Sequence, residues 1–590
     1  MTPTIRPIVV VLIATLTFAF GCAQPPATQP ETTSPPPSVA RDAQQRPVET
    51  EPVADNVAVG QPSTVRPEAE RKAELSRGRA QLDSIVVAGS GIAQNHYGYI
   101  PPHPLPSPVN RENYAEINAN PVHRASETPV STLSIDVDTG AYANVRRWLN
   151  DGQLPPQDAV RVEELINYFS YDYDAPRQRN VPFSVSHEIA PAPWNTNNYL
   201  LHVGIQGYVP PTRDIPNANL VFLIDVSGSM NTPNKLELLK SSLAMLTKQL
   251  GKDDRVSIVV YAGASGVVLE PTPGNQRATI IAALKRLQAG GSTNGAAGIE
   301  LAYLMAEQAF IEDGINRVLI ATDGDFNVGT VNIEMLKDLI EDKRKSGIAL
   351  TTLGFGTGNY NDHLMEQLAD VGNGNYAYID TLNEARKVLV DELSATMLTI
   401  AKDVKIQIEF NPAVVAEYRL IGYENRLLNR EDFNNDKVDA GEIGAGHTVT
   451  AVYEVSLVDG KGQLTDPLRY QTAESVADTS GEIAFLRLRY KQPNAEQSAL
   501  IEAPIHRRDV IDRVSAASEN FRFSAAVAAF AQTLRGGRYT GNYDYAAIET
   551  LARESRGTDP HGYRSEFVSL VALADSLSQT APIAHVRDPD

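Results

Sequence analysis

The oxygen-bearing side chains of one short loop are the strongest chemical signal in this sequence. An apolar run over 220–224 predicts a buried strand and leads directly into Asp225, Ser227 and Ser229. These three residues alternate along the chain, and Gly228 between them lets the backbone turn closely. One tight loop can therefore direct a carboxylate and two hydroxyls at a single point.

Two further oxygen-bearing residues come from other loops of the chain. Thr293 lies in a glycine-rich loop over 290–295, directly before a predicted helix, and Asp323 follows the apolar run 318–321. Carboxylate and hydroxyl oxygens are hard ligands of the type that Mg²⁺ and Mn²⁺ prefer. The pattern predicts a divalent-cation site built by three strand ends.

This constellation resembles the metal-ion-dependent adhesion site of the von Willebrand factor A (integrin I-like) family. The resemblance spans residues 217–400 and fills five positions in family order, namely Asp225, Ser227, Ser229, Thr293 and Asp323. It implies that the hydroxyls contact Mg²⁺ or Mn²⁺ directly and that the two acids act partly through water. It also implies an open coordination position for an Asp or Glu of a protein partner. In the alternative interpretation the loop is a hydrogen-bonded turn in a scaffold, and the cation only stabilises it.

A broader resemblance covers most of the chain. The segments 131–139, 159–169, 418–426 and 431–447 are similar to the YfbK-like group of bacterial von Willebrand A lipoproteins. The resemblance implies a shared architecture, and that group has no firmly assigned biochemical role. It therefore identifies related proteins without naming a ligand.

Strand-like and helical segments alternate between residues 217 and 400. This rhythm predicts an α/β fold with a doubly wound, mostly parallel sheet, in which ligands bind beyond the carboxyl ends of the strands. The expected strands are 220–224, 256–261, 317–321, 348–354 and 376–379, and the expected helices are 235–250, 276–287, 296–310, 333–345 and 361–370.

Strand signals also flank this α/β block on both sides, which predicts a β-sandwich into which the block is inserted or which flanks it. The expected sandwich strands are 183–189, 200–205, 404–410, 414–420, 449–457 and 483–490. We divide the chain into a signal peptide (1–21), a tether (22–83), an N-terminal α+β region (110–175), sandwich strands (180–210), the A-type domain (217–400), the rest of the sandwich (403–500) and a helical C-terminal region (505–580).

The N-terminal segment has the pattern of a secretory signal. Arg6 precedes an apolar run over 8–20, which is short for a membrane span. Residues 19–22 resemble a bacterial lipobox, although an alanine and a phenylalanine stand where the family prefers other residues. We expect Cys22 to be lipidated and, because Ala23 is not Asp, the outer membrane to be its location. Ordinary cleavage that leaves a free thiol is the alternative.

The residues after Cys22 have a composition that does not form a core. Pro, Thr, Gln, Glu and Ala dominate 23–83, which predicts a disordered tether. The segment 85–90 resembles the TonB-box-like segments of outer-membrane receptors, and an incidental edge strand is the interpretation we favour. The formal net charge of −20 argues against nucleic acid and anionic lipid as partners.

Two further groups of acids could suggest metal sites. We interpret Asp136 and Asp138 as a strand end and a helix cap, with Asp138 or Thr139 capping a helix over 141–149 and an amphipathic helix following over 161–169. A second acidic group begins like a calcium-binding EF-hand loop, but Lys and Ile occupy positions that require Gly and Glu. We interpret it as a polar interdomain loop; its members are Asp432, Asn434, Asp436 and Asp439.

No motif in the sequence indicates an enzyme. We find no nucleophile elbow, phosphate loop or zinc-protease motif. Catalysis would require His202 or His363 to approach the serines in space, or Asp325 to act as a base beside the cation. We therefore expect a binding protein of the cell envelope, with a purely structural lipoprotein as the alternative.

Overall fold

The computed structural model describes residues 112–135, 138–178, 180–291, 295–324, 333–466 and 481–580. The signal peptide, Cys22, the tether and the segment 85–90 lie outside these residues, as do Asp136, Thr293 and Asp325. Within the described ranges, no helix has the length and hydropathy needed to cross a membrane.

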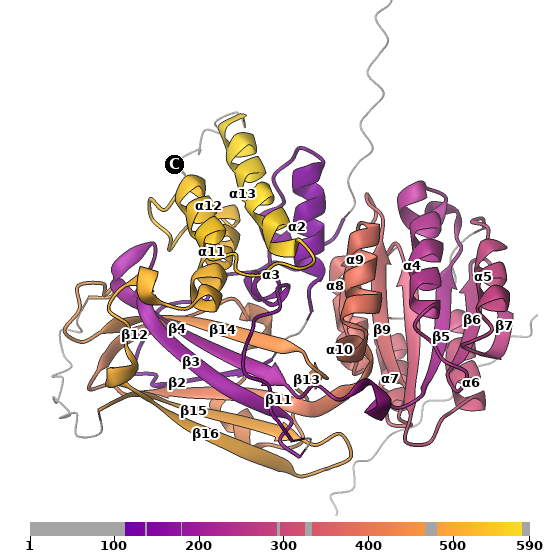
Figure 1. Cartoon of the computed structure of the whole chain (residues 1–590), viewed down its shortest axis with the longest axis horizontal. Helices are drawn as coiled ribbons and strands as arrows, with labels where there is room; N and C mark the ends of the chain where they lie inside the picture. The colour runs from indigo at the N-terminus through magenta and orange to yellow at the C-terminus, as the bar shows by residue number, and fades with distance from the viewer. Residues whose placement is uncertain are drawn as a thin grey trace, which may run out of the picture. The chain divides into compact units, whose positions relative to one another are not determined.

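A six-stranded sheet forms the centre of the α/β block (Figure 1). Its strand order is β10-β9-β8-β5-β6-β7, and only the edge strand β7 runs antiparallel to its neighbour. The apolar runs predicted five of these strands, while β7 escaped prediction. The strands are β5 (Ala218–Asp225), β6 (Arg255–Tyr261), β7 (Ser265–Pro273), β8 (Ile315–Thr322), β9 (Ala349–Phe355) and β10 (Tyr376–Ile379).

Helices cover both faces of this sheet because its central strands are apolar on both sides. Leu220 and Phe222 of β5 pack with one set of helices, whereas Val221 and Leu223 pack with the other. The first set comprises α4 (Leu238–Thr247), α5 (Arg277–Lys285) and α9 (Leu382–Arg386); the second comprises α6 (Gly295–Gln308), α7 (Ile333–Arg344) and α8 (Asp362–Val371). The predicted doubly wound sheet is confirmed.

Two further sheets form the sandwich, and their pairing confirms the insertion. Strand β4 precedes the α/β block and pairs antiparallel with β14, which follows it. One sheet has the order β1-β12-β14-β4-β3, and the other has β13-β11-β15-β16 with β2 paired to β11. The strands are β1 (His123–Arg124), β2 (Val130–Ser134), β3 (Phe183–Ala192), β4 (Asn195–Gly207), β11 (Thr399–Phe410), β12 (Val415–Ile421), β13 (Gly441–Gly444), β14 (Thr448–Leu457), β15 (Glu482–Lys491) and β16 (Ser498–His506).

The N-terminal region departs from two expectations. Helix α2 (Gly140–Asn150) begins after Thr139, whose side chain makes no capping hydrogen bond. Instead, Glu164 accepts a hydrogen bond from the backbone N–H of Ala141 at 2.8 Å, and Asp138 accepts one from the backbone N–H of Tyr376 at 2.8 Å. The predicted cap position at Thr139 is confirmed, but its side chain makes no capping hydrogen bond, because Glu164 from a more distant segment accepts from the first turn instead.

Helix α3 (Val162–Asn167) is buried on every side and is therefore not the amphipathic helix that the sequence predicted. Its acidic residues are buried because they have fixed partners: Glu163 accepts from the backbone of Tyr423, and Glu164 pairs with Arg161. Arg161 also pairs with Asp362 at the start of α8, so that a buried ionic cluster joins α3 to the α/β block.

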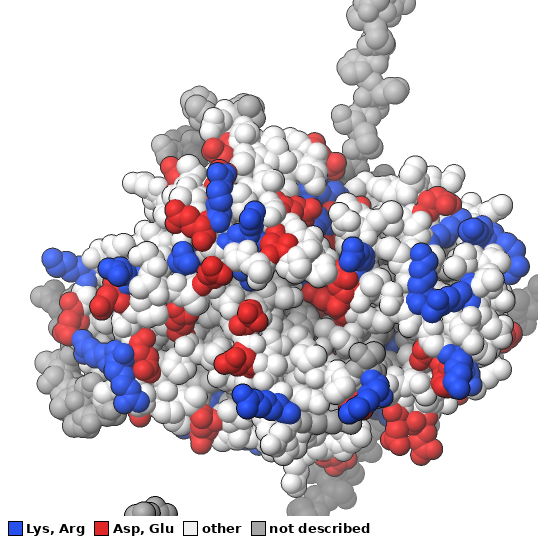
Figure 2. All heavy atoms as spheres, in the orientation of Figure 1, with Lys and Arg blue, Asp and Glu red and all other residues white. Residues whose placement is uncertain are grey.

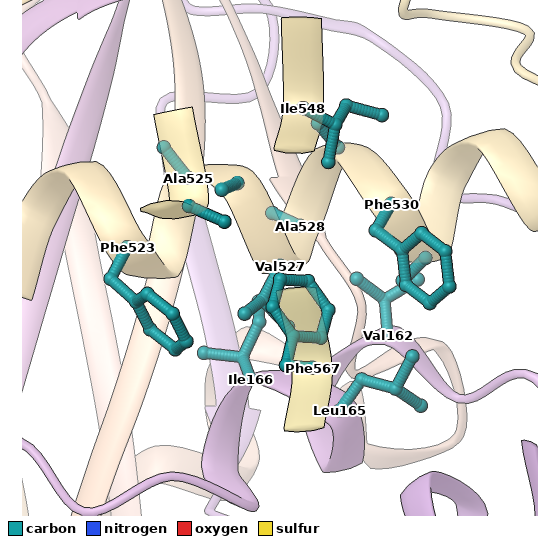
Figure 3. Close-up of a cluster of buried hydrophobic side chains, with 14 of the residues drawn as sticks. Val162, Leu165, Ile166, Phe523, Ala525, Val527, Ala528, Phe530, Ile548 and Phe567 are labelled. Carbon is teal, nitrogen blue, oxygen red and sulfur yellow. The ribbon is translucent and has the colours of Figure 1, made fainter. Parts of the chain in front are cut away.

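The C-terminal helices pack over α3. Figure 3 shows Phe523 and Val527 of α11 (Glu519–Leu534) close to Ile166 and Phe567, and Phe530 of the same helix close to Val162. Phe567 belongs to α13 (Tyr563–Thr580), and α12 (Tyr545–Glu554) contributes Ile548 to the same buried cluster. This helical layer is thus part of the sandwich-side core.

The predicted polar interdomain loop is confirmed. The carboxylates of the calcium-like segment point to separate partners: Asp432 accepts from Asn429, and Asp439 pairs with Arg344 of α7 at 2.7 Å. Asp436 accepts from the hydroxyl of Ser498 at 2.6 Å. Because each acid is engaged elsewhere, they do not gather around one point.

Candidate functional site

The loop after β5 holds its oxygen atoms in a fixed arrangement. Asp225 ends the strand, and its Oδ1 accepts a hydrogen bond from the backbone N–H of Ser227 at 2.8 Å. The hydroxyl oxygens of Ser227 and Ser229 lie 2.9 Å apart. Asp225 and Ser227 are buried, whereas Ser229 is half-buried and Gly228 is exposed, so the group meets the surface at the tip of the loop.

Asp323 reaches the same edge of the sheet because β8 lies beside β5 in parallel. It follows the last residue of β8, Thr322, whose hydroxyl donates to Asp225 Oδ2 at 2.8 Å. The Asp323 side chain is fully buried. Two of the predicted strand ends therefore meet, as parallel strands in one sheet require.

The glycine-rich loop also lies against the first loop. The backbone N–H of Gly228 donates to the carbonyl of Gly291 at 3.0 Å, and the N–H of Gly290 donates to the carbonyl of Val226 at 2.8 Å. Gly291 has φ of 90°, a conformation that favours glycine. Thr293 follows this anchored segment but lies outside the described residues.

Burial shifts the pKa of Asp225. It raises the pKa of Asp225 to about 6, against the lowering effect of hydrogen bonds from Ser227, and the negative charge of Asp323 adds to the rise. Tyr261 lies beside them, and its burial, together with the charge of Asp225, raises its pKa well above 10. Carboxylates so crowded and desolvated gain stabilisation from a cation.

Sequence reasoning missed two neighbours of Asp323. The ammonium of Lys235 donates to Asp323 Oδ2 at 2.9 Å, and the amide of Asn359 donates to the same oxygen at 3.2 Å. Lys235 was predicted only as the start of a helix, and Asn359 lies in a loop before α8. Neither has a sequence signal of its own, because their contact with Asp323 depends on how separate loops fold together.

The donor set fits a hard divalent cation. It consists of two carboxylates and two hydroxyls from the described part of the chain, and Thr293 follows the Gly290–Gly291 segment that is hydrogen-bonded to the serine loop. In the described segments, no cluster of three or more His, Cys, Asp or Glu residues could hold a metal. A cation at this edge would therefore need the serine hydroxyls as well as the acids as ligands.

The two histidines considered for catalysis have other surroundings. His202 lies on β4, where its Nε2 is 3.1 Å from the Tyr173 hydroxyl and where burial lowers its pKa to about 4. His363 lies on α8, with its Nε2 2.9 Å from the side-chain amide of Gln367. The hydroxyl of Ser227 instead faces that of Ser229.

Basic and acidic side chains are interspersed over the face shown in Figure 2, without a broad patch of one sign. A nucleic-acid surface would show a continuous basic stripe. This face lacks that feature, in agreement with the acidic composition of the chain.

Three family models match the chain. The von Willebrand factor type A domain matches residues 219–392, the description "von Willebrand factor" matches residues 108–202, and "Uncharacterized protein YfbK, C-terminal" matches residues 395–577. The matched segments correspond to the α/β block, the N-terminal region with the first sandwich strands, and the remainder of the sandwich with the helical layer.

Named relatives agree with these matches. The uncharacterized protein YfbK of Escherichia coli (strain K12) is 48% identical over 473 residues, which is 79% of this chain and 81% of that protein. The human inter-alpha-trypsin inhibitor heavy chain H3 is 25% identical over 47% of this chain, but the match spans only 33% of the human protein.

The chain also matches solved structures over part of its length. One is a von Willebrand factor type A protein from Catenulispora acidiphila, at 16% identity, covering 66% of this chain and 89% of that chain with a TM-score of 0.37. Another is proximal thread matrix protein 1 from the mussel byssus with a zinc-occupied MIDAS motif, at 23% identity, covering 30% of this chain and 45% of that chain with a TM-score of 0.26.

Proposed function

Since the chain belongs to the YfbK family of von Willebrand factor type A domain proteins, we propose that it binds a protein partner through a divalent cation, Mg²⁺ or Mn²⁺. The cation site lies at the carboxyl ends of β5 and β8. Ser227, Ser229 and Thr293 hold the cation directly, and Asp225 and Asp323 supply the negative charge around it.

One observation carries this proposal: two serine hydroxyls lie 2.9 Å apart at the tip of a loop, next to the buried acids Asp225 and Asp323. Neutral hydroxyls leave most of the charge of a cation uncompensated, so a bound cation supplies an electrophilic centre for a carboxylate from outside. The half-buried Ser229 gives a partner access to this point.

Binding rather than catalysis is the role that we assign to the serines. A nucleophilic serine needs an adjacent base, and the partner of Ser227 is another hydroxyl. His202 and His363 are engaged by Tyr173 and Gln367 respectively. We propose that the protein does no covalent chemistry at this site.

The cellular setting follows from the N-terminal sequence. We propose that lipidated Cys22 anchors the chain to the bacterial envelope and that residues 23–83 tether the folded part to the membrane. Retention of the chain with the outer membrane in the wild type, and its release in Cys22→Ala, would test this; equal release of both would contradict it.

Affinity capture tests the binding function directly. The purified chain would be immobilised and exposed to solubilised envelope in Mg²⁺, eluted with EDTA, and the eluted proteins identified by mass. We expect a partner that elutes with EDTA and that Asp225→Ala does not retain. Replacement of the exposed Asp253 by Ala is the matched control. A partner that binds equally with EDTA and to Asp225→Ala would favour the scaffold alternative and refute the proposal.

A further inference from the structure

The side chain of Lys235 brings a positive charge into the proposed cation site. Its side chain is 8% exposed, and its ammonium donates to Asp323 Oδ2 at 2.9 Å. We infer that Lys235 is an internal competitor of the divalent cation: its ammonium compensates Asp323 and thereby lowers the cation affinity of the site. This inference rests on the proposed function and identifies what regulates it.

The fold directs the Lys235 side chain toward Asp323. Lys235 lies in η4 (Pro233–Glu237), the turn that follows the serine loop. Its aliphatic stem crosses the backbone at Gly356, where a Cβ would lie 2.3 Å from two of the Lys235 side-chain carbons. Gly356 has φ of 79°, and its carbonyl accepts a hydrogen bond from the Tyr378 hydroxyl at 2.6 Å. Gly356 thus leaves room for the stem, and its own position is fixed.

A second acceptor holds the ammonium in place. Asn359 Oδ1 accepts from the Lys235 ammonium at 2.9 Å, while Asn359 Nδ2 donates to Asp323 Oδ2 at 3.2 Å. Lysine, asparagine and aspartate therefore form a closed triangle. Such an arrangement orients the ammonium more strongly than a single surface ion pair would, and burial reduces its screening by solvent.

The charges of the two acids and of Lys235 show how the lysine weakens cation binding. With both acids ionised, Asp225 and Asp323 supply two negative charges and Lys235 supplies one positive charge. A divalent cation entering this group meets one net negative charge instead of two, and it must also share Asp323 with the ammonium. The electrostatic attraction between the site and the cation is therefore weaker. Loading the site takes a higher cation concentration than it would without Lys235.

A Mn²⁺ titration tests the inference. Free Mn²⁺ would be measured by electron paramagnetic resonance while the full chain is titrated at pH 8. We expect Lys235→Met to bind Mn²⁺ about tenfold more tightly than the wild type, which corresponds to about 1.4 kcal/mol. Lys235→Arg keeps the charge, and we expect it to remain within about threefold of the wild type.

Lys387→Met is the matched control, because Lys387 is a buried lysine of the same domain that pairs with Glu392 and not with the site. We expect it to leave Mn²⁺ affinity unchanged, and circular dichroism checks that each variant is folded. Equal or weaker Mn²⁺ binding by folded Lys235→Met would overturn the inference while leaving the cation site standing. No Mn²⁺ binding by any of the proteins would overturn the proposed cation site together with the inference.

Discussion

Glu442 is a carboxyl group that the fold makes costly to ionise. It lies on β13 and lines a cavity of about 540 Å³ between the α/β block and the sandwich, together with Arg317 and Arg344. Burial raises its pKa from 4.5 to about 8, and the negative charges of Asp439 and Asp403 add to the rise. We predict that Glu442→Gln stabilises the protein at neutral and alkaline pH.

The magnitude follows from the two pKa values. Below pH 4.5 the carboxyl is protonated in both the folded and the unfolded chain, so Glu442 does not reduce the free energy of unfolding there. As the pH rises toward 8, the unfolded chain releases the proton first, and the free energy of unfolding falls by up to about 5 kcal/mol. Because Glu442 keeps a small exposed fraction, solvent screens part of this effect. We expect a loss of about 2–3 kcal/mol in the free energy of unfolding.

Urea unfolding measures this difference. Trp148 and Trp194 report on the N-terminal and sandwich side of the molecule, where Glu442 also lies. We expect Glu442→Gln to exceed the wild type in unfolding free energy at pH 8.5, and to match it at pH 4.5. Glu496→Gln, which replaces an exposed glutamate, is the control and should change neither value.

Two results would refute the reasoning. The first is a Glu442→Gln variant that is no more stable than the wild type at pH 8.5. The second is a stabilisation that stays constant between pH 4.5 and pH 8.5, because a titration effect must vanish where both states are protonated.

Three further predictions concern other positions in the folded part. Arg161→Met leaves two buried carboxylates without their counter-charge and should lower the unfolding free energy by about 3–5 kcal/mol; calorimetry showing a loss below about 1 kcal/mol would contradict this. Burial lowers the pKa of His202 from 6.5 to about 4, so the wild type should lose up to about 3 kcal/mol as the pH falls through that window, and His202→Gln should lose less in acid denaturation; parallel pH curves would rule this out. A Cβ at Gly374 would lie 1.6 Å from the carbonyl oxygen of Leu350, so Gly374→Ala should destabilise the α/β block by more than about 3 kcal/mol, and a thermal midpoint equal to that of the wild type would show the reasoning to be wrong.

The local pattern of the sequence determined most of the fold. A strand buried on both faces needs a continuous apolar run, so β5 and β8 could be located from composition alone. The edge strand β7 escaped prediction because its residues are only partly buried. The order of strand signals before and after the α/β block also predicted its insertion into the sandwich, which the pairing of β4 with β14 confirms.

In the candidate site, too, some contacts follow from the local sequence and others only from the tertiary structure. Asp225, Ser227 and Ser229 lie in one loop, so their proximity is a property of the sequence, and Asp323 joins them because neighbouring parallel strands end at one edge. The approach of Lys235 to Asp323 is different. It depends on separate loops folding over one another, and no local pattern records which distant charge will be buried beside an acid. The sequence determined which oxygens line the site, whereas the tertiary structure decided its charge, because burial and through-space contact exist only in the folded chain.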